Sequence, residues 1–163
     1  MTPVALSLGS SLGDRAVHLQ RAMAVLSVLP GLRLTRASRV SWTPPVGGVA
    51  RSFFLNAVVI GETDLSPHDL LAACKRLEQK LGRRPTRRFA DRIIDIDLLL
   101  YGTLSLRDPS LELPHPRLKE RDFFLDLLAE VWPDAPHPEG GSWRAHYPSP
   151  PHFPRVGCLR ILR

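Results

Sequence analysis

The chain has 163 residues with a formal net charge of +6, and 44% of its residues are hydrophobic. This length allows one domain with a substantial core, and the basic excess favours an anionic ligand. The two cysteines form no CxxC pair, which argues against a disulfide framework. Neither a signal peptide nor an apolar run of bilayer length is recognisable, so we expect a cytoplasmic protein without a membrane partner.

The first half of the chain predicts a strand, a helix and two further strands. Val4–Leu8 is a short apolar strand, and a turn leads from it into a helix that begins near Asp14. One face of this helix is expected to carry Ala16, Leu19, Met23 and Leu26. Leu32–Trp42 and Phe53–Gly61 predict the next two strands, with a loop rich in proline and glycine between them.

The second helix has the clearest boundaries. Ser66 is its expected N-cap, Pro67 its first residue, and Asp69 completes an arrangement like a capping box. Gly82 is expected to end the helix, and the strand Ile93–Tyr101 follows. The apolar stripe of the helix is Leu70, Leu71, Cys74, Leu77 and Leu81.

The order of these elements, β-α-β-β-α-β, predicts an α+β fold of the ferredoxin-like type with an antiparallel sheet. A small hairpin over Leu104–Leu113 and a helix over about residues 119–131 are added to this core. We expect residues 1–133 to form one domain. Residues 134–163 are rich in proline and are expected either to pack on that domain or to stay loosely ordered.

Asp95 and Asp97 occupy alternate positions of the last predicted strand, so they share one of its faces. The opposite face is expected to pack on the helices and to carry Ile94, Ile96, Leu98 and Leu100. Two acids in so apolar a strand are costly unless positive charge meets them.

Five arginines precede these acids within ten residues: Arg83, Arg84, Arg87, Arg88 and Arg92. Two interpretations of the acids and arginines remain open at this point. One is a network of ion pairs with a structural role. The other is a Mg²⁺ site, in which the carboxylates hold the metal and the arginines clamp the phosphates bound to it.

Several motifs of the chain resemble one family in order and spacing. They are LGSSLGD near the start, TPP at Thr43–Pro45, FLNA at Phe54–Ala57, RRFADRIIDIDLLLYG, LPHPRLKER at Leu113–Arg121, and Phe123. Over about Val4–Pro133 the chain resembles the 6-hydroxymethyl-7,8-dihydropterin pyrophosphokinases of the folate pathway. The resemblance implies transfer of pyrophosphate from ATP to the pterin, with release of AMP and use of two Mg²⁺ ions.

The resemblance also implies roles for individual residues. Asp95 and Asp97 would be the metal ligands and, with Arg83 and Arg92, the catalytic residues. The residues expected to contact ATP are Arg84, Arg88, Arg92, His115 and Arg121. Those expected to contact the pterin are Phe54 and Phe123 on its two faces, Asn56 at its polar edge, and Thr43, Pro44 and Val46 of the adjacent loop. We expect a monomer that binds ATP and a reduced pterin, and no nucleic acid.

The chain departs from the family pattern at two places. Ser11 stands where the family usually has asparagine, so Ser11 or water must replace what that side chain anchors. Phe89, Ala90 and Asp91 stand in place of Trp-Gly-Pro. These changes remove an indole N–H donor, alter the stiffness of the loop and add a negative charge near the expected phosphates.

Two other functions fit parts of the pattern. A ferredoxin-like core is also the topology of an RNA recognition motif, but Val4–Leu8 carries no aromatic residue for stacking on bases. A two-metal phosphohydrolase usually has more carboxylate or histidine ligands than two, and His18, His68 and His137 show no ligand-like spacing.

Overall fold

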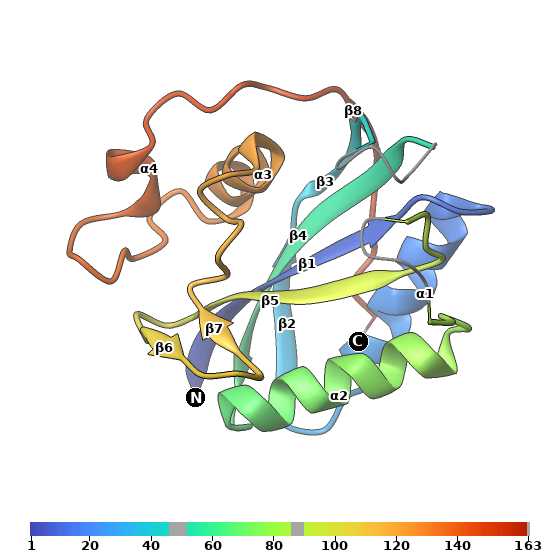
Figure 1. Ribbon diagram of the computed structural model, residues 1–163, viewed down its shortest axis with the longest axis horizontal. Helices are drawn as coiled ribbons and strands as arrows, with labels where there is room; N and C mark the ends of the chain where they lie inside the picture. The colour runs from blue at the N-terminus through green and yellow to red at the C-terminus, as the bar shows by residue number, and fades with distance from the viewer. Residues whose placement is uncertain (46–51, 86–89, 163) are drawn as a thin grey trace.

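The computed structural model describes residues 1–45, 52–85 and 90–162. An antiparallel sheet in the order β5-β1-β4-β3-β8 forms the centre, and β2 also pairs with β4 (Figure 1). The strands are β1 (Thr2–Ser10), β2 (Leu32–Ala37), β3 (Arg39–Thr43), β4 (Phe54–Thr63), β5 (Asp95–Tyr101) and β8 (Arg155–Cys158). Apart from β8, which joins the edge late in the chain, this is the ferredoxin-like order. The predicted α+β class is therefore confirmed.

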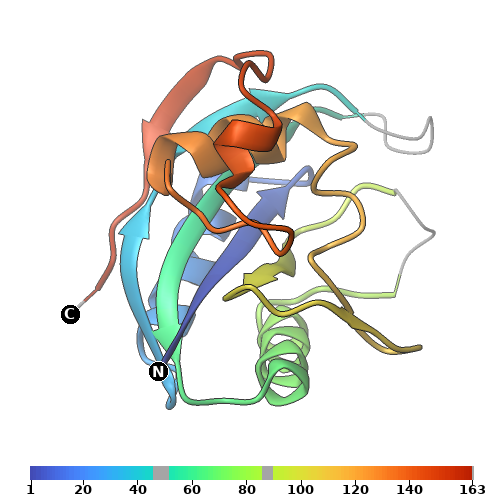
Figure 2. The ribbon, with the colours of Figure 1, turned by 90° about the vertical axis from the view of Figure 1, so that its left-hand side faces the viewer.

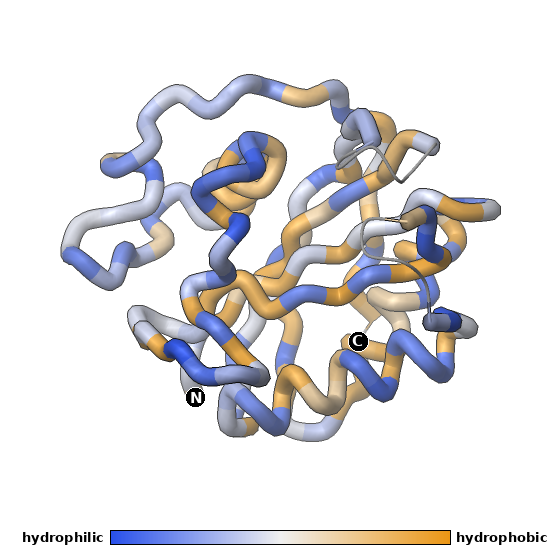
Figure 3. Tube along the Cα trace, in the orientation of Figure 1, coloured by the Kyte–Doolittle hydropathy of each residue, from blue (hydrophilic) through white to orange (hydrophobic). Residues whose placement is uncertain are grey.

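Two pairs of helices cover the two faces of the sheet (Figures 1 and 2). Helices α1 (Arg15–Ser27) and α2 (Pro67–Lys80) pack on one face, while α3 (Asp122–Val131) and α4 (Trp143–His146) lie on the other. The apolar segments of the strands gather in the middle of the molecule (Figure 3). Among the described residues, no helix is both long and apolar enough to cross a membrane.

The boundaries of α2 confirm the sequence prediction. The Asp69 backbone N–H donates to the Ser66 hydroxyl oxygen over 3.1 Å, and Pro67 is the first helical residue. Gly82 follows the helix with a φ angle of +100°, which a residue with a side chain rarely adopts. Leu70 and Cys74 are fully buried, whereas Leu71, Leu77 and Leu81 are only partly buried.

The predicted face of α1 is wrong at one position. Asp14 caps this helix, and its carboxylate accepts a hydrogen bond from the Val17 backbone N–H. Leu19, Met23 and Leu26 are buried as expected, but Ala16 is exposed and Ala22 is buried instead. Ala16 lies in the exposed first turn of the helix, whereas Ala22 lies on the side that packs on the sheet.

Leu32–Trp42 is not one strand, as predicted, but two. The chain leaves the regular ladder at Ser38, between β2 and β3. There the Ser38 hydroxyl oxygen accepts a hydrogen bond from the Val58 backbone N–H, while the Ser38 N–H donates to the Val58 carbonyl. A side chain therefore takes the place of a backbone acceptor, which lets β2 and β3 pair with different parts of β4.

The predicted alternation of β5 side chains between the two faces of the sheet is wrong at Leu100. The pairing of β5 with β1 passes from Leu100 opposite Ala5 directly to Leu98 opposite Leu6, so Leu99 is the extra residue of a bulge. Ile96 and Leu98 pack with α1 and α2, but Leu100 lies with Leu99 in the cluster below α3. Asp95 and Asp97 precede the bulge and do share one face, as predicted.

The elements after β5 pack on the same sheet. The hairpin of β6 (Leu106–Arg107) and β7 (Glu112–Leu113) turns at Asp108, whose carboxylate accepts from the Ser110 and Leu111 N–H groups. The proline-rich residues 134–162 then cross α3 and add β8 to the sheet edge beside β3. The buried guanidinium of Arg155 ties this segment to α3 through ion pairs of 2.7 Å with each of Asp126 and Glu130.

Gly61 in the middle of β4 should be essential for packing, because a Cβ atom there would lie 2.7 Å from the Arg33 backbone oxygen. We expect Gly61→Ala to lower the free energy of unfolding by about 1–3 kcal/mol, measured by urea denaturation. Gly157→Ala in β8 is the matched control, because a Cβ atom there meets nothing within 4 Å. A Gly61→Ala protein as stable as this control would contradict the packing described for β2 and β4.

Candidate functional site

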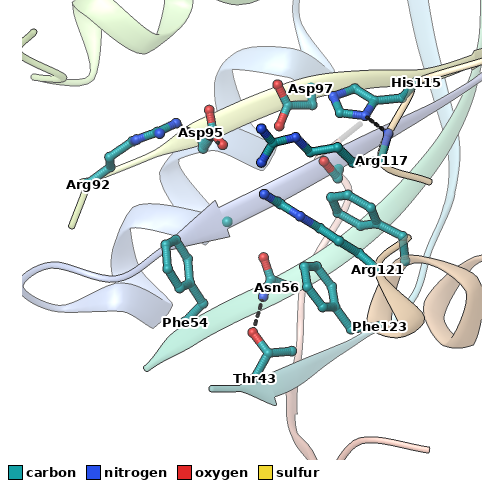
Figure 4. A pocket seen from close by; sticks show the side chains of 13 residues that line it. Thr43, Phe54, Asn56, Arg92, Asp95, Asp97, His115, Arg117, Arg121 and Phe123 are labelled. Carbon is teal, nitrogen blue, oxygen red and sulfur yellow. Dashed lines mark hydrogen bonds and ion pairs between the residues drawn. The ribbon is translucent and has the colours of Figure 1, made fainter. Parts of the chain in front are cut away.

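A cavity of about 190 Å³ opens between the sheet and the segment that leads into α3. Its floor is formed by side chains from one face of three neighbouring strands (Figure 4). The strand register places Gly9 of β1 directly between Asp95 of β5 and Asn56 of β4. A Cβ atom on Gly9 would lie 2.7 Å from the Asn56 side-chain oxygen, so the absence of a side chain there keeps the floor open.

One end of the cavity is aromatic and amide-lined. Phe54 of β4 and Phe123 at the start of α3 lie on either side of Asn56 (Figure 4). The Asn56 side-chain N–H₂ donates to the Thr43 hydroxyl over 2.6 Å, and both side chains are buried. This bond orients the amide of Asn56, whose free polar atoms can recognise the edge of a flat heterocycle. Aromatic surface on two sides suits the faces of such a ring.

The other end of the cavity is strongly charged. Asp95 and Asp97 present their carboxylates there, and Arg92, Arg117 and Arg121 line the same space (Figure 4). Arg92 contacts Asp95 over 3.3 Å. The Arg92 Nε–H group is buried and has no hydrogen-bond acceptor among the described residues. Buried donors are normally paired, so this one points to an acceptor supplied by a ligand.

The two aspartates have opposite pKa shifts. Burial and the neighbouring charge of Asp95 raise the pKa of Asp97 well above its usual range. Burial would also raise the pKa of Asp95, but the charges of Arg92, Lys75 and Arg83 outweigh it and lower the pKa. Two neighbouring carboxylates that interact in this way favour the binding of a cation, because the cation removes their mutual repulsion.

Basic and acidic groups behind the cavity hold Asp95 and Asp97 in place. Arg83 donates to Asp95 over 2.9 Å and to Glu78 of α2 over 2.5 Å. Lys75 lies 3.6 Å from Asp97 and donates to Glu78 over 3.1 Å. The Glu78 carboxylate, which is 3% exposed, also accepts from the backbone N–H of Ile96, between the two aspartates. Glu78 therefore connects α2 to the part of β5 that carries the acids.

Lys75 and Glu78 were missed by the sequence analysis. Both lie on α2, and Glu78 follows the apolar position Leu77 in the helical stripe. A glutamate on the buried side of an amphipathic helix was the available signal, because such a side chain needs a basic or N–H partner. Arg117 was also missed, although it lies within the LPHPRLKER motif.

A backbone hydrogen bond to β5 positions His115. Its backbone N–H donates to the Leu99 carbonyl over 2.9 Å, and its ring Nδ1 accepts from the Arg117 N–H over 3.2 Å. Burial and the nearby charge of Arg121 lower the pKa of His115 to about 4. The ring is therefore neutral at physiological pH, so it acts as a hydrogen-bonding group and not as a further cation.

Ser11 occupies the position where the family pattern has asparagine. Its hydroxyl oxygen accepts from the Arg92 backbone N–H, and its own N–H donates to the Arg92 carbonyl, each over 2.9 Å. Ser11 therefore fixes the backbone of Arg92 beside the cavity. Ala90 and Asp91 are the other departures within the described residues, and the Asp91 carboxylate accepts from the Ser52 N–H over 3.4 Å.

The structure gathers most, but not all, of the residues that the sequence singled out. Those lining the cavity are Thr43, Phe54, Asn56, Arg92, Asp95, Asp97, His115, Arg121 and Phe123. Arg83 lies behind the cavity in contact with Asp95, whereas Arg84 and Pro44 are exposed and outside the lining. Val46, Arg88 and Phe89 lie outside the described residues.

A flat, apolar slot beside carboxylates and guanidinium groups is typical of an enzyme that transfers a phosphoryl-type group to a heterocyclic substrate. The model of the 7,8-dihydro-6-hydroxymethylpterin-pyrophosphokinase family matches residues 5–133. The chain therefore belongs to this family, as its motifs predicted. Neither the RNA-binding nor the phosphohydrolase alternative gains support.

Named relatives agree with the family match. The chain is similar to the 2-amino-4-hydroxy-6-hydroxymethyldihydropteridine pyrophosphokinase of Methylorubrum extorquens, with 44% identity over 82% of this chain and 85% of the relative. The protein of the same name from Bacillus subtilis is 37% identical over 77% of this chain and 75% of the relative.

The fold is also found in a solved structure. The crystal structure of Plasmodium falciparum HPPK-DHPS with pteroate matches with a TM-score of 0.68 and 17% sequence identity. The match covers 90% of this chain but 42% of that one, so the present chain spans about two fifths of the length of that protein.

Glu78 should contribute to stability through its three partners, Lys75, Arg83 and the Ile96 N–H. We expect Glu78→Gln to lower the free energy of unfolding by about 1–3 kcal/mol, because an amide offers one acceptor oxygen in place of two charged ones. Urea denaturation measures the change, with the exposed Glu120→Gln as the control. If both variants were as stable as the parent protein, the connecting role of Glu78 would be refuted.

Proposed function

We propose that this protein transfers the diphosphate group of ATP to the hydroxymethyl group of 6-hydroxymethyl-7,8-dihydropterin, a step in folate biosynthesis. The products are AMP and the pterin diphosphate. One observation carries this proposal. The same cavity has an aromatic, amide-lined end and an end lined by carboxylates and guanidinium groups. Family membership supports the same reaction.

The pterin is assigned to the aromatic end. Its ring would lie between Phe54 and Phe123, with its polar edge on Asn56, whose amide is held by Thr43. Pterin edges carry both hydrogen-bond donors and acceptors, and an amide side chain supplies both in return. Pro44 and Val46 are proposed to contact the pterin from the adjoining loop, as the family resemblance implies.

The triphosphate of ATP is assigned to the charged end. Arg92 supplies a buried Nε–H donor without a partner among the described residues, and Arg121 lines the same space. His115, with its neutral ring, is proposed to hydrogen-bond the nucleotide. Arg84 and Arg88 are further proposed contacts that rest on the family resemblance alone.

Asp95 and Asp97 are proposed to hold two Mg²⁺ ions. The donor set fits this metal, because Mg²⁺ prefers one or two carboxylates and completes its shell with water and phosphate oxygens. The close approach of two partly buried carboxylates of opposite pKa shift also fits a cation. When bound, Mg²⁺ would neutralise charge on the phosphates during transfer.

The protein's own groups mainly position the reactants. The pterin oxygen must form a bond to the β-phosphorus while the bond from that phosphorus to the α-phosphate oxygen breaks, and the hydroxyl loses its proton. Arg83 and Arg92 hold Asp95, and Arg92 also reaches the cavity, so both are proposed as catalytic residues. Guanidinium groups stabilise the charge that the transferred group carries in the transition state.

Residues 1–133 are proposed to be the catalytic domain, since every residue that lines the cavity lies between Ser7 and Phe124. Because a single chain supplies both ends of the cavity, the site needs no second subunit, and the monomeric state stays a prediction. The cytoplasmic location stays a prediction.

The proposal is tested by mixing the protein with ATP, Mg²⁺ and 6-hydroxymethyl-7,8-dihydropterin and measuring the nucleotide product. We expect AMP in equal amount to the pterin consumed. Asp95→Asn and Asp97→Asn should each lower kcat/KM by about a hundredfold or more, because loss of charge neutralisation costs several kcal/mol in the transition state.

Asp134→Asn is the control for these variants, because Asp134 is an exposed acid that does not line the cavity. Circular dichroism checks that each variant is folded. ADP as the stoichiometric product would overturn the reaction, and near-normal turnover of either active-site variant would overturn the metal assignment.

The Phe123 side chain should contribute to the affinity for the pterin and not to the affinity for ATP. We expect Phe123→Ala to raise the dissociation constant of the pterin about tenfold or more, because one face of the ring loses its aromatic partner. Affinity for a non-hydrolysable ATP analogue with Mg²⁺ should change little. Calorimetric titration measures both constants.

Phe53→Ala serves as the comparison for this variant, since Phe53 precedes Phe54 in the chain but is exposed and does not line the cavity. Loss of nucleotide binding with intact pterin binding in Phe123→Ala would refute the assignment of the aromatic end.

A further inference from the structure

Three side chains that can bind metal ions meet in the C-terminal segment, outside the cavity and outside the span of the family match. His137, Glu139 and His146 each offer one ligand atom, and these atoms all lie within 4.8 Å of one another. Their separation along the chain gave no sign of this grouping. The fold brings the loop that carries His137 and Glu139 together with α4, which carries His146, at the outer side of the molecule (Figure 1).

The backbone around His137 forms a tight, hydrogen-bonded loop. The His137 N–H donates to the Gly141 carbonyl over 2.9 Å, and the Gly140 N–H donates back to the His137 carbonyl over 3.0 Å. Gly140 and Gly141 have φ angles of +96° and +72°, which only glycine adopts readily. The loop therefore holds His137 and Glu139 next to the beginning of α4.

The short helix α4 carries the third side chain into the same place. The Ser142 hydroxyl oxygen caps α4 by accepting from the Ala145 N–H over 3.1 Å. His146 at the end of the helix stacks on His137, with ring centroids 3.7 Å apart and an interplanar angle of 20°. The indole of Trp143, which is buried, supports the His137 ring from another side at 4.5 Å.

One of the two imidazoles is already oriented as metal-binding histidines usually are. The ring Nε2 of His146 lies 2.9 Å from the Gly140 carbonyl oxygen, so this nitrogen carries the proton and donates it. Histidine ligands typically donate one ring N–H to a backbone carbonyl in this way, which leaves the other nitrogen for the metal. The Nδ1 atom of His146 is thus the nitrogen left available for a metal.

We propose that His137, Glu139 and His146 form a binding site for a divalent transition-metal ion of the Zn²⁺ type. Two imidazoles and one carboxylate are a ligand set that Zn²⁺ prefers, whereas Mg²⁺ prefers oxygen ligands. The site is separate from Asp95 and Asp97 in both position and chemistry. It would leave one coordination position for water.

Metal binding would require a small rearrangement of the side chains. Ligand atoms around tetrahedral Zn²⁺ lie roughly 3.3 Å apart, given metal–nitrogen bonds of about 2.0–2.1 Å. The stacked rings must therefore tilt so that their nitrogen atoms converge. Glu139 and His146 are exposed, and the stacking contact and the Gly140 hydrogen bond of His146 would have to adjust. The hydrogen bond from the Glu139 N–H to His137 Nδ1 would be exchanged for the metal bond.

The position of the site suggests what a bound ion would do. His137 and Glu139 line a second cavity of about 690 Å³, whose opposite wall includes His115 and the β6–β7 hairpin. An ion held by both the loop and α4 would cross-link residues 137–146. It would thereby make the C-terminal wall of this cavity more rigid and would stabilise the segment that leads to β8.

The full-length protein, freed of metal with a chelator, is titrated with Zn²⁺ in a calorimeter in the presence of excess Mg²⁺. Mg²⁺ occupies oxygen-ligand sites and competes poorly for imidazole, so the titration reports on the histidine site. We expect one Zn²⁺ ion to bind. His146→Gln should weaken binding about tenfold or more. The double variant Asp95→Asn/Asp97→Asn should bind as the parent protein does.

His68→Gln is the matched control, because His68 is also exposed and lies 2.7 Å from the Asp108 carboxylate, but within the described part of the chain it belongs to no cluster of three possible metal ligands. Its affinity for Zn²⁺ should equal that of the parent. Titration with Co²⁺, whose visible absorption changes on nitrogen ligation, gives a second readout that does not depend on heat. Thermal unfolding of each variant without metal checks that the fold is intact.

Three outcomes would overturn the site, and the first two are no Zn²⁺ binding by the parent protein in excess Mg²⁺ and equal binding by the parent and His146→Gln. Loss of binding in the Asp95→Asn/Asp97→Asn double variant would also overturn it, since the ion would then belong to the cavity. None of these results bears on the release of AMP, so the metal site and the proposed function fail or stand separately.

Discussion

The mutual repulsion of two carboxylates on one face of a buried strand is the constraint on which the site depends. Asp95 and Asp97 can remain there only because basic groups from the chain before the strand and from α2 surround them. Glu78 holds two of those basic groups and the backbone between the aspartates. The same contacts that balance the charge therefore attach α2 to β5.

This electrostatic arrangement leaves the front of the carboxylates open. Gly9 removes a side chain from the sheet surface at the one position where it would meet Asn56, and the cavity extends from there to Phe54 and Phe123. A charged region and an apolar slot thus share one wall. A ligand with a flat ring and an anionic ligand can bind side by side without either meeting the wrong surface.

Two errors in the predicted strands have a common physical origin. Leu100 follows a bulge at Leu99 and turns to the other side of the sheet, and the uniform run Leu98–Leu100 does not mark where the bulge lies. Leu32–Trp42 divides at Ser38 because a hydroxyl replaces a backbone acceptor opposite Val58. In both cases the partner strand decides the outcome, and the partner strand is distant in sequence.

The sequence by itself determined the caps of α2, the shared face of Asp95 and Asp97, the ferredoxin-like order and the family. These depend on neighbouring residues or on motifs whose spacing is visible along the chain. Only the tertiary structure decided that Glu78 lies behind the acids and that His146 stacks on His137. A buried ion pair or a cluster of ligands is defined by distances in space, and these follow from how helices and strands pack rather than from any local pattern.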